Sequence, residues 1–504
     1  MHRFGWISKQ LNALHGNIPS GPDEVLERVG TPRDEEFAQA LRDIPEEKFG
    51  YVVPLFQCLI AAIRPLSLEE LADISKELDP NADSHTDAVL SACPALITCD
   101  PNDPTIVQFT HESVKDFLIS DRLRTSSIEN TPGSRFFPKD AHATLARVCI
   151  NVLLRFDEPA DKKQLESSPL ALYAAQYWVE HTRRGEAAAK NQDVMEILFD
   201  KNKSHLKAWI CMYDIDKVQS RTTENLAEHP SSHIRTPLYY AALCGFTELV
   251  KLTADLYDRR DSIGNHGTPL HAASYKGYDE TVDALLAIVG SDLEKVNKKV
   301  DKKTPLHAAY YGGHLKIMKA LLDKGAEVDA TDTLDTSGTP DTPGNTLLHC
   351  ASLDGQVEVV DLLLEFEANI NAKNENGWTP LHRATLGGQV KVAERLLNFT
   401  SKNENDKNPK ALVDAQSNDK NTPLHVASII GNLPIVELLL GHKANRDIEG
   451  EHGWTPLEAA VENRHKKIAE RLARSDPWWG QWGGGELRRR GMEKWRDFRR
   501  YTHT

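Results

Sequence analysis

Apolar and polar positions follow one arrangement seven times in the C-terminal half of this 504-residue chain. Each copy opens with Thr, usually continues with Pro and Leu, and in six copies reaches a Gly nine residues after the Thr. A strongly apolar stretch such as residues 359–364 follows. Thr caps helices, Pro suits the first helical position, and Gly accepts the left-handed conformation that ends a helix. The pattern therefore predicts seven pairs of short helices, with copies starting at Thr236, Thr268, Thr304, Thr346, Thr379, Thr422 and Thr455.

One such pair cannot bury its own apolar face, so the copies are expected to stack. The spacing of 32 to 43 residues, together with the string T-P-L-H-x-A, resembles the ankyrin repeat. We expect a mainly α fold in which an ankyrin solenoid of seven repeats occupies residues 233–474. The first and last copies carry Tyr239 and Glu458 where the others carry His, and we interpret these departures as end caps with a more polar outer face.

The recurring His residues raise the question of a metal site, because they form a row along the predicted stack. The alternative is that each imidazole hydrogen-bonds backbone groups and locks the loop to the helix, and we favour it. The row comprises His271, His307, His349, His382 and His425.

Two long spacings point to polar insertions, at residues 331–344 and 401–416. We expect both to enlarge the loops that project before the next Thr, called fingers here. They are either specificity loops at a binding face or tolerated surface insertions. Trp378 and Trp454 immediately precede Thr in two copies. These two side chains are the candidate partner-binding residues, although packing against the next finger is an equal alternative.

The N-terminal half does not repeat. Apolar spacing predicts a helix over residues 46–63, and Ser67 with Glu70 forms a capping box that opens a helix to Leu78. A third helix is expected at 84–92, two strands at 95–99 and 105–110, and a closing helix at 112–123. Three helices with a hairpin constitute a winged-helix arrangement.

Charge argues against DNA binding by this winged helix. Residues 65–123 carry three basic and twelve acidic side chains, and the expected third helix has no Lys or Arg. Phosphate contacts would be repulsive. The whole chain has a formal charge of −14, which also disfavours a general affinity for nucleic acid or anionic membranes.

Segments 66–72 (LSLEELA) and 107–118 (VQFTHESVKDFL) resemble the winged helix that follows the NACHT nucleotide-binding module in fungal NACHT–ankyrin proteins. Segment 173–178 (YAAQYW) resembles the helical region that follows there, and residues 4–7 (FGWI) and 10–11 (QL) resemble the last helix of the NACHT module. The resemblance implies a division into residues 1–45 (NACHT remnant helices), 46–125 (winged helix), 126–232 (helical linker), 233–474 (ankyrin repeats) and 475–504 (a tail).

The sequence departs from that family in one respect. Its members are signalling NTPases, yet no G-x-x-x-x-G-K-[ST] loop occurs here, so we expect the NTPase core to be missing. In related switch ATPases a winged-helix histidine contacts nucleotide, and His111 lies in a comparable place. Without the core, His111 is expected to cap its helix or pack locally. No other catalytic motif appears, and we expect no cofactor and no catalytic residue.

The tail interleaves Trp with Lys and Arg. It is either a disordered extension, which we favour, or a contact for nucleic acid or membrane. No apolar run reaches the length of a membrane span, and no secretory signal is evident, so a cytoplasmic location is expected, with the nucleus also open. The expected function is a non-enzymatic scaffold that binds protein partners, in immune or incompatibility signalling. The alternative is a NACHT-family NTPase whose core is absent from this chain.

Overall fold

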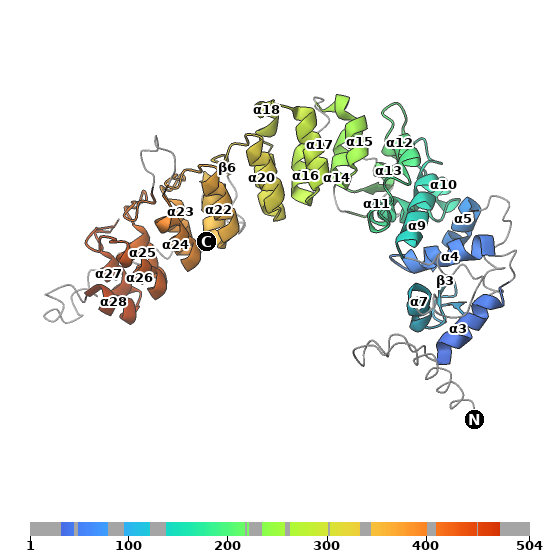
Figure 1. Ribbon diagram of the computed structural model, residues 1–504, viewed down its shortest axis with the longest axis horizontal. Coiled ribbons are helices and arrows are strands. Elements are labelled where there is room, and N and C mark those ends of the chain that lie inside the picture. The colour runs from blue at the N-terminus through green and yellow to red at the C-terminus, as the bar shows by residue number, and fades with distance from the viewer. Residues whose placement is uncertain are drawn as a thin grey trace, which may run out of the picture. The chain divides into compact units, whose positions relative to one another are not determined.

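A computed structural model describes residues 32–44, 49–78, 95–120, 138–216, 219–220, 234–257, 263–300, 303–332, 344–400, 410–450 and 452–473. The fold is mainly helical, as expected (Figure 1). It divides into two compact units, Met1–Asn265 and His266–Thr504. The expected helix at 84–92, the segment at 4–11 and the tail lie outside the described residues. The bounds of the five expected domains remain predictions.

The first unit begins with a winged-helix domain. Helix α3 (Pro32–Arg42) precedes α4 (Phe49–Ala61), α5 (Leu68–Leu78) and α7 (Glu112–Ile119). Its antiparallel sheet has the order β1-β3-β2, with strands Leu66–Ser67 (β1), Ile97–Cys99 (β2) and Ile106–Phe109 (β3). Strand β1, where Leu66 pairs with Val107, was missed because a two-residue strand has no alternating pattern to detect.

Helix α5 begins at the predicted capping box and ends at Leu78, as the sequence predicted. The Ser67 N–H donates to Glu70 Oε2 at 2.8 Å, and the Glu70 N–H donates to Ser67 Oγ at 3.1 Å. This is the reciprocal capping box that satisfies two otherwise unpaired donors. The described helices and strands of the winged-helix domain therefore confirm the predicted elements to within a few residues.

A helical region follows. It contains α9 (Pro138–Leu153), α10 (Lys162–Glu166), α11 (Ala171–Arg184), α12 (Gln192–Leu198) and α13 (His205–Met212). A short ribbon pairs β4 (Tyr213–Asp214) with β5 (Gln219–Ser220). Helix α9 packs against both α4 and α11, so it joins the winged-helix domain to the helical region.

The first repeat pair, α14 (Pro237–Cys244) and α15 (Thr247–Leu252), belongs to this unit and is followed by a 3₁₀ turn, η4 (Ala254–Leu256). Trp178 stacks on Phe246 with ring centroids 5.3 Å apart and meets Trp209 edge-on at 5.1 Å. Our cap interpretation of Tyr239 was wrong. Its side chain is fully buried and its hydroxyl donates to Asp216 at 2.5 Å, because the helical region already covers this end of the repeat.

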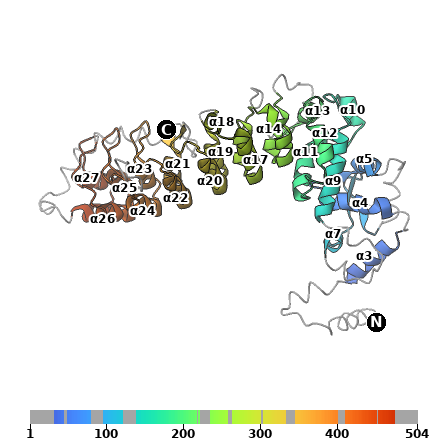
Figure 2. The ribbon, with the colours of Figure 1, turned by 45° about the horizontal axis from the view of Figure 1, so that its top comes forward.

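The second unit contains six further helix pairs in its described residues (Figures 1 and 2). In chain order the pairs are α16 (Pro269–Lys276) with α17 (Asp279–Val289), α19 (Pro305–Gly312) with α20 (Leu315–Asp323), α21 (Leu347–Asp354) with α22 (Val357–Glu365), α23 (Pro380–Leu386) with α24 (Val390–Asn398), α25 (Pro423–Ile430) with α26 (Leu433–Gly441), and α27 (Pro456–Glu462) with α28 (Lys466–Ala473). Single-turn α18 (Leu293–Val296) lies between the first two of these pairs. The first member of each pair is called the inner helix below.

Neighbouring pairs pack helix against helix, as shown by α17 with α20, α22 with α24, and α24 with α26. Each inner helix starts at a Thr with extended backbone, and the predicted glycines are left-handed, with φ from 69° at Gly388 to 88° at Gly431. Arg464 takes the same conformation at φ 61° in the last copy, without the freedom of Gly. The sequence interpretation of the repeat is thus confirmed at its start and at its turn.

Both insertions contribute described residues to fingers. Strands β6 (Thr331–Asp332) and β7 (Asn345–Thr346) pair antiparallel, so the ends of the first insertion lie in a finger, as expected. Residues 410–416 of the second insertion lie in the finger after α24, where the Asn371 side chain donates to the Lys410 carbonyl at 2.8 Å. Residues 333–343 and 401–409 lie outside the described residues.

Candidate functional site

The candidate site is the surface made by the fingers and inner helices of the second unit, called the finger–helix face. Figure 2 shows finger loops along one edge of the row of helices from α21 to α27. Three sets of hydrogen bonds recur from repeat to repeat and join each repeat to the next. They determine how rigidly this face is presented.

The first set uses the recurring histidines. In four copies the Nε2–H donates to a backbone carbonyl just before the Thr of the following repeat. The pairs are His271 to Lys303 at 2.9 Å, His349 to Trp378 at 2.9 Å, His382 to Asn421 at 3.0 Å and His425 to Trp454 at 2.9 Å. The favoured interpretation, in which imidazole locks loop to helix, agrees with this geometry.

The second ring nitrogen is also engaged. His349 Nδ1 accepts from the Thr346 N–H at 3.2 Å and lies 2.8 Å from the Thr346 hydroxyl. Both nitrogens of such a ring are therefore occupied, and neither is available as a metal ligand. Burial lowers the pKa of His271, His349 and His382 to about 4, so these rings are neutral near pH 7.

The second set joins finger to finger. At one position of each finger an Asn or Asp side chain accepts a backbone N–H from the next finger. The pairs are Asn297 with Glu327 at 2.6 Å, Asp329 with Asn369 at 3.1 Å, Asn371 with Leu412 at 2.8 Å and Asp414 with Asn445 at 2.9 Å. A short polar side chain suits this role because neighbouring fingers lie close together and Asn or Asp loses little rotamer freedom when it is fixed. Sequence analysis missed this set. Asn371 and Asp414 each stand eight residues before a Thr, but Asn297 stands 7 and Asp329 stands 17 residues before one, so no constant spacing marked the set.

The third set lies at the far end of the inner helices. His314 lies 3.2 Å from the Tyr275 carbonyl, Gln389 donates to the Leu353 carbonyl at 3.0 Å, and His465 lies 3.0 Å from the Ile429 carbonyl. These rings and amides occupy the space beside the turn glycines. A Cβ at Gly277 would lie 2.3 Å from His314, so Gly is required there by contact as well as by backbone conformation.

Apolar side chains emerge from the finger–helix face at the seventh position after Thr. Tyr275 is 40% exposed and Leu386 is 39% exposed, while Tyr311, Leu353 and Ile429 are half-buried at the equivalent position. Ile430 adds a side chain that is 40% exposed. Rigid elements presenting an apolar row between polar fingers are suited to contact another protein, because little entropy is lost on binding.

Trp378 and Trp454 both lie on this face, one residue before their Thr, and both are half-buried. Their backbone carbonyls are acceptors for the histidines of the preceding repeats. The Trp378 ring lies 5.8 Å from the His382 ring, and Trp454 lies 5.8 Å from His452. Each indole therefore has a packing role within its own repeat while keeping part of its surface accessible. Their proposed role as contact anchors remains a prediction.

His111 lies in the first unit, at the N-cap of α7. Its Nδ1 accepts from the Ser113 N–H at 3.1 Å and lies 2.7 Å from the Ser113 hydroxyl. The side chain is exposed. This geometry provides the local capping role that sequence analysis expected once the nucleotide-binding core was set aside.

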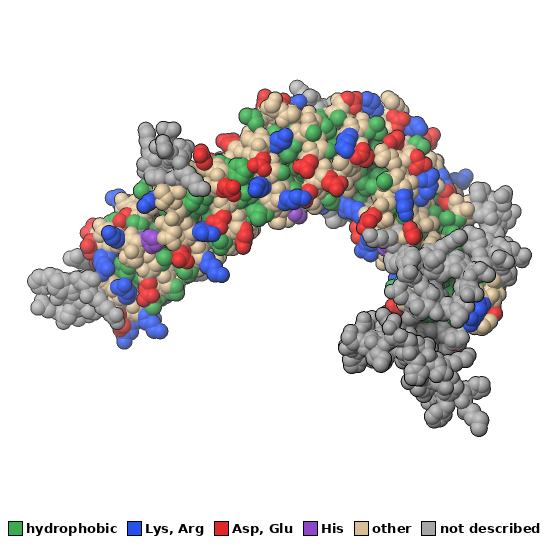
Figure 3. Space-filling view, in the orientation of Figure 1, with side chains coloured by type: hydrophobic (Ala, Val, Ile, Leu, Met, Phe, Trp, Pro, Cys, Tyr) green, Lys and Arg blue, Asp and Glu red, His purple; other side chains and the backbone are tan. Residues whose placement is uncertain are grey.

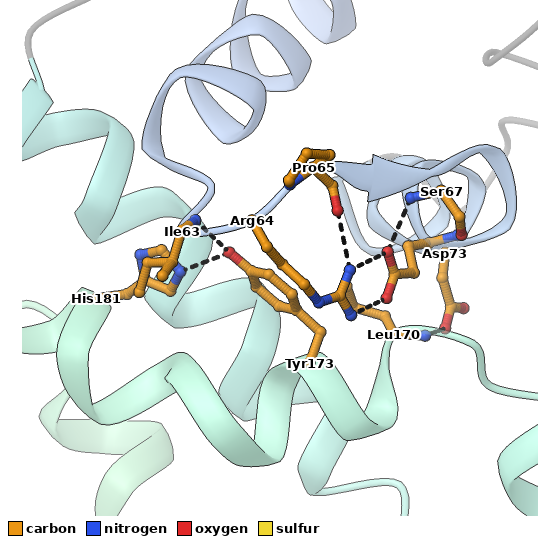
Figure 4. Close-up of polar contacts among 9 residues, drawn as sticks. Ile63, Arg64, Pro65, Ser67, Asp73, Leu170, Tyr173 and His181 are labelled. Atoms are coloured by element: carbon orange, nitrogen blue, oxygen red, sulfur yellow. Dashed lines mark hydrogen bonds and ion pairs between the residues drawn. The ribbon is translucent and has the colours of Figure 1, made fainter. Parts of the chain in front are cut away.

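A second polar cluster, absent from the sequence interpretation, joins the winged helix to the helical region (Figure 4). Glu70 is buried, accepts the Ser67 N–H, and forms a two-pronged pair with Arg64 at 2.5 and 2.9 Å. The Arg64 guanidinium lies 4.9 Å from the ring centre of Tyr173. Glu70, which caps α5, thus also holds the Arg64 guanidinium against the Tyr173 ring of α11.

The same cluster continues on both sides. Asp73 is buried and accepts from Arg155, from the Ser168 hydroxyl at 3.1 Å and from the Leu170 N–H at 3.3 Å. Tyr173 accepts the Ile63 N–H at 3.1 Å, and its oxygen lies 2.9 Å from His181 Nε2. Burial lowers the pKa of His181 to about 3, so the ring is neutral. These bonds fix the two parts of the first unit against each other and leave no polar atom of Asp73 free for chemistry.

Within the described part of the chain, no group of three His, Cys, Asp or Glu side chains is arranged to hold a metal ion. No described helix has both the length and the apolar character to cross a lipid bilayer. Acidic and basic side chains are intermixed over the surface drawn in Figure 3.

Comparisons with known proteins agree with this architecture. Two families of ankyrin repeats match, one at residues 306–364 and 348–397 and the other at 185–297, 254–332 and 403–478. Residues 54–128 match the winged helix domain of GPI inositol-deacylase. Ankyrin repeats and a winged-helix domain are therefore present in this chain, which confirms the expected fold class.

A curated relative is the "Azaphilone pigments biosynthesis cluster protein L" of Monascus ruber, which is 25% identical over 303 residues. The match covers 55% of this chain and 61% of that protein. The chain thus spans less than two thirds of the relative's length.

Proposed function

We propose that this protein is a non-enzymatic scaffold that binds a protein partner through the finger–helix face. The supporting observation is the rigid repetition of that face. Three sets of inter-repeat bonds hold the apolar row at Tyr275, Leu353 and Leu386 in a constant relation to the fingers. Ankyrin repeats in general bind other proteins, and a preorganised surface of this kind limits the entropic penalty of association.

The winged-helix match supports a finer proposal. The chain is a relative of fungal NACHT-type signalling proteins, acting in immune or incompatibility signalling from the cytoplasm, with nuclear residence also open. Polar groups that could serve chemistry in the described residues, including Asp73, Glu70 and His181, are engaged in bonds that join helices. This engagement supports a binding role in place of catalysis, and we propose no nucleic acid or membrane as partner.

Site-specific crosslinking tests the proposal. A photoreactive amino acid would replace Leu386 on the finger–helix face or, as a matched control, Lys391 on the outer helix α24; both positions are exposed. Both full-length variants would be irradiated in cell extract. The proposal requires crosslinks to a discrete protein from position 386 and none from position 391. Equal labelling from both positions, or none from position 386, would refute it.

The NTPase alternative requires a separate measurement. The purified chain would be titrated with fluorescent ATP and GTP analogues in the presence of Mg²⁺. We expect no saturable binding at micromolar concentration. Micromolar affinity that disappears on His111→Ala substitution would overturn the non-enzymatic proposal, because it would place nucleotide against the winged helix.

A further inference from the structure

One part of the finger–helix face differs from the rest in charge. It consists of inner helices α16 and α19 with the finger between them, and its described residues are 268–277, 297–300 and 303–312. They carry four lysines and no carboxylate: Lys276, Lys298, Lys299 and Lys303. The two residues between, Asp301 and Lys302, contribute one charge of each sign. The set is called the basic patch below.

Aromatic rings accompany these cations. The Lys303 ammonium lies 4.5 Å from the ring centre of Tyr311, and Lys276 lies 5.8 Å from that of Tyr275. The His266 ring stacks on the Tyr275 ring, with centroids 5.2 Å apart. Lys298 and Lys299 are exposed, and the finger that bears them is fixed to α16 by the bond from His271 to the Lys303 carbonyl at 2.9 Å. The cations are therefore presented from a fixed loop and a fixed helix.

The C-terminal end of the second unit has the opposite sign. The equivalent described residues of inner helices α25 and α27 and their finger, 422–431, 448–450 and 454–463, carry three acidic side chains and no Lys or Arg. The acidic residues are Glu449, Glu458 and Glu462. Because exposed charges are screened beyond about 10 Å at moderate salt, the basic patch acts locally in spite of the net charge of −14.

We propose that the basic patch is a docking site for an acidic, extended segment of a protein partner, whose carboxylates pair with Lys298, Lys299 and Lys276 while an apolar side chain contacts Tyr275 and Tyr311. The inference rests on the proposed function, for which it names the partner chemistry. A short peptide matches the patch because neighbouring helices pack about 8–10 Å apart, so two repeats accommodate only a few extended residues. A long polyanion would extend onto the next finger, which carries Glu327 and Asp329, and this disfavours nucleic acid.

Fluorescence anisotropy with the full-length protein tests the inference. The probe is a fluorescein-labelled twelve-residue peptide of alternating Asp and Glu with one central Phe, and its control is the same peptide with Asn and Gln in place of the acids. We expect saturable binding of the acidic peptide alone, weakening as salt rises from 50 to 300 mM. The variant Lys298→Glu/Lys299→Glu should bind at least roughly tenfold more weakly, since it replaces two attractions with repulsions.

The matched control is Lys319→Glu/Lys391→Glu, which makes the same charge change at exposed positions on the outer helices α20 and α24. It should bind within about twofold of the unmodified protein, because these sites are screened from the patch. Circular dichroism and thermal midpoints would establish that both variants fold. Equal losses in the two variants would overturn the inference, since net charge alone would then explain binding.

Three other outcomes would also overturn it. These are failure of the acidic peptide to bind, tighter binding of single-stranded DNA than of the peptide at the same patch, and concentration-dependent self-association, seen by sedimentation, that Lys298→Glu/Lys299→Glu abolishes. None of these outcomes would refute the proposed function, because crosslinking from position 386 does not depend on the basic patch.

Discussion

The imidazole of His349 donates its Nε2 hydrogen to the backbone carbonyl of Trp378, 29 residues further along the chain and in the next repeat. The same ring accepts the N–H of Thr346, which starts its own helix. One buried side chain thus caps a helix and links two repeats. The consequences of this relationship are testable.

Replacing His349 by Ala should destabilise the second unit by about 2 kcal/mol, because the Trp378 carbonyl and the Thr346 N–H would both lose their partner in a buried setting. Urea unfolding of the full-length protein, followed by hydrogen exchange in α21 and α23, would measure the loss. The exposed substitution Lys319→Ala serves as control and should remain within about 0.5 kcal/mol. A His349→Ala protein as stable as the unmodified chain would show that the inter-repeat bond is dispensable.

Acid should loosen the same unit. Burial lowers the pKa of His271, His349 and His382 from 6.5 to about 4 in the folded protein. The unfolded state therefore binds more protons, and stability that is complete above pH 6.5 is lost as the pH falls from 6.5 towards 4. Each ring contributes a slope of up to about 1.4 kcal/mol per pH unit within that window.

The measurement is hydrogen exchange in α16, α21 and α23 between pH 7.5 and 5, corrected for intrinsic rates. Protection should decline below pH 6.5, and less steeply in a His349→Gln protein. Protection that stays constant from pH 6.5 to 5 would mean that these rings are protonated at little energetic penalty.

Substitutions at two adjacent glycines distinguish the stability lost to backbone strain from the stability lost to a steric clash between repeats. Gly313 has φ 77° and open space around a potential Cβ, whereas a Cβ at Gly312 would lie 2.3 Å from the Tyr275 carbonyl. Gly313→Ala should lose about 1 kcal/mol from the left-handed conformation alone. Gly312→Ala should lose more, about 2 kcal/mol, because the neighbouring backbone must shift. Thermal unfolding of both variants decides the order, and the reverse order would contradict the packing described here.

The junction drawn in Figure 4 should depend on Asp73, which receives hydrogen bonds from Arg155, Ser168 and Leu170. Asp73→Ala leaves these donors without their acceptor and should destabilise the first unit by about 2 kcal/mol; the half-exposed Arg155 keeps access to water, which limits the loss. Glu180→Ala removes an exposed pair with Arg184 and should change little. Chemical denaturation of the two variants compares them, and equal effects would argue against a structural role for the buried acid.

The first repeat should depend on its contact with the helical region. Phe246→Ala removes a ring that stacks on Trp178 and is 4% exposed, so the expected loss is about 3 kcal/mol. The control is Leu252→Ala in the same repeat, where the side chain is 57% exposed and the loss should be under 1 kcal/mol. Tryptophan fluorescence during urea unfolding would report both. A small effect of Phe246→Ala would mean that the first repeat folds independently of the helices before it.

Sequence analysis succeeded where the determinants are local. The Thr cap, the turn glycine and the Ser67–Glu70 capping box each act within a few residues, so they can be recognised from the sequence before the fold is known. The histidines were interpreted correctly for the same reason, since their Thr partner lies three residues away. The face that presents Trp378 and Trp454 could also be anticipated, because the repeat period places them at equivalent positions.

Other features depend on residues far apart in the chain. Asp73 meets Ser168 across 95 positions, and Tyr239 is buried only because Asp216 and the helical region cover it. Asn371 bonds the backbone at Lys410 across 39 positions, so this contact between fingers also appears only in the folded chain.

By itself, the sequence determined the repeat, its helices and its turns, because capping and backbone conformation operate over short separations. Only the tertiary structure decided which side chains join one repeat to the next and where Lys276 and Lys303 meet the rings of Tyr275 and Tyr311. Those outcomes depend on which distant segments pack together, and that is a property of the folded chain as a whole.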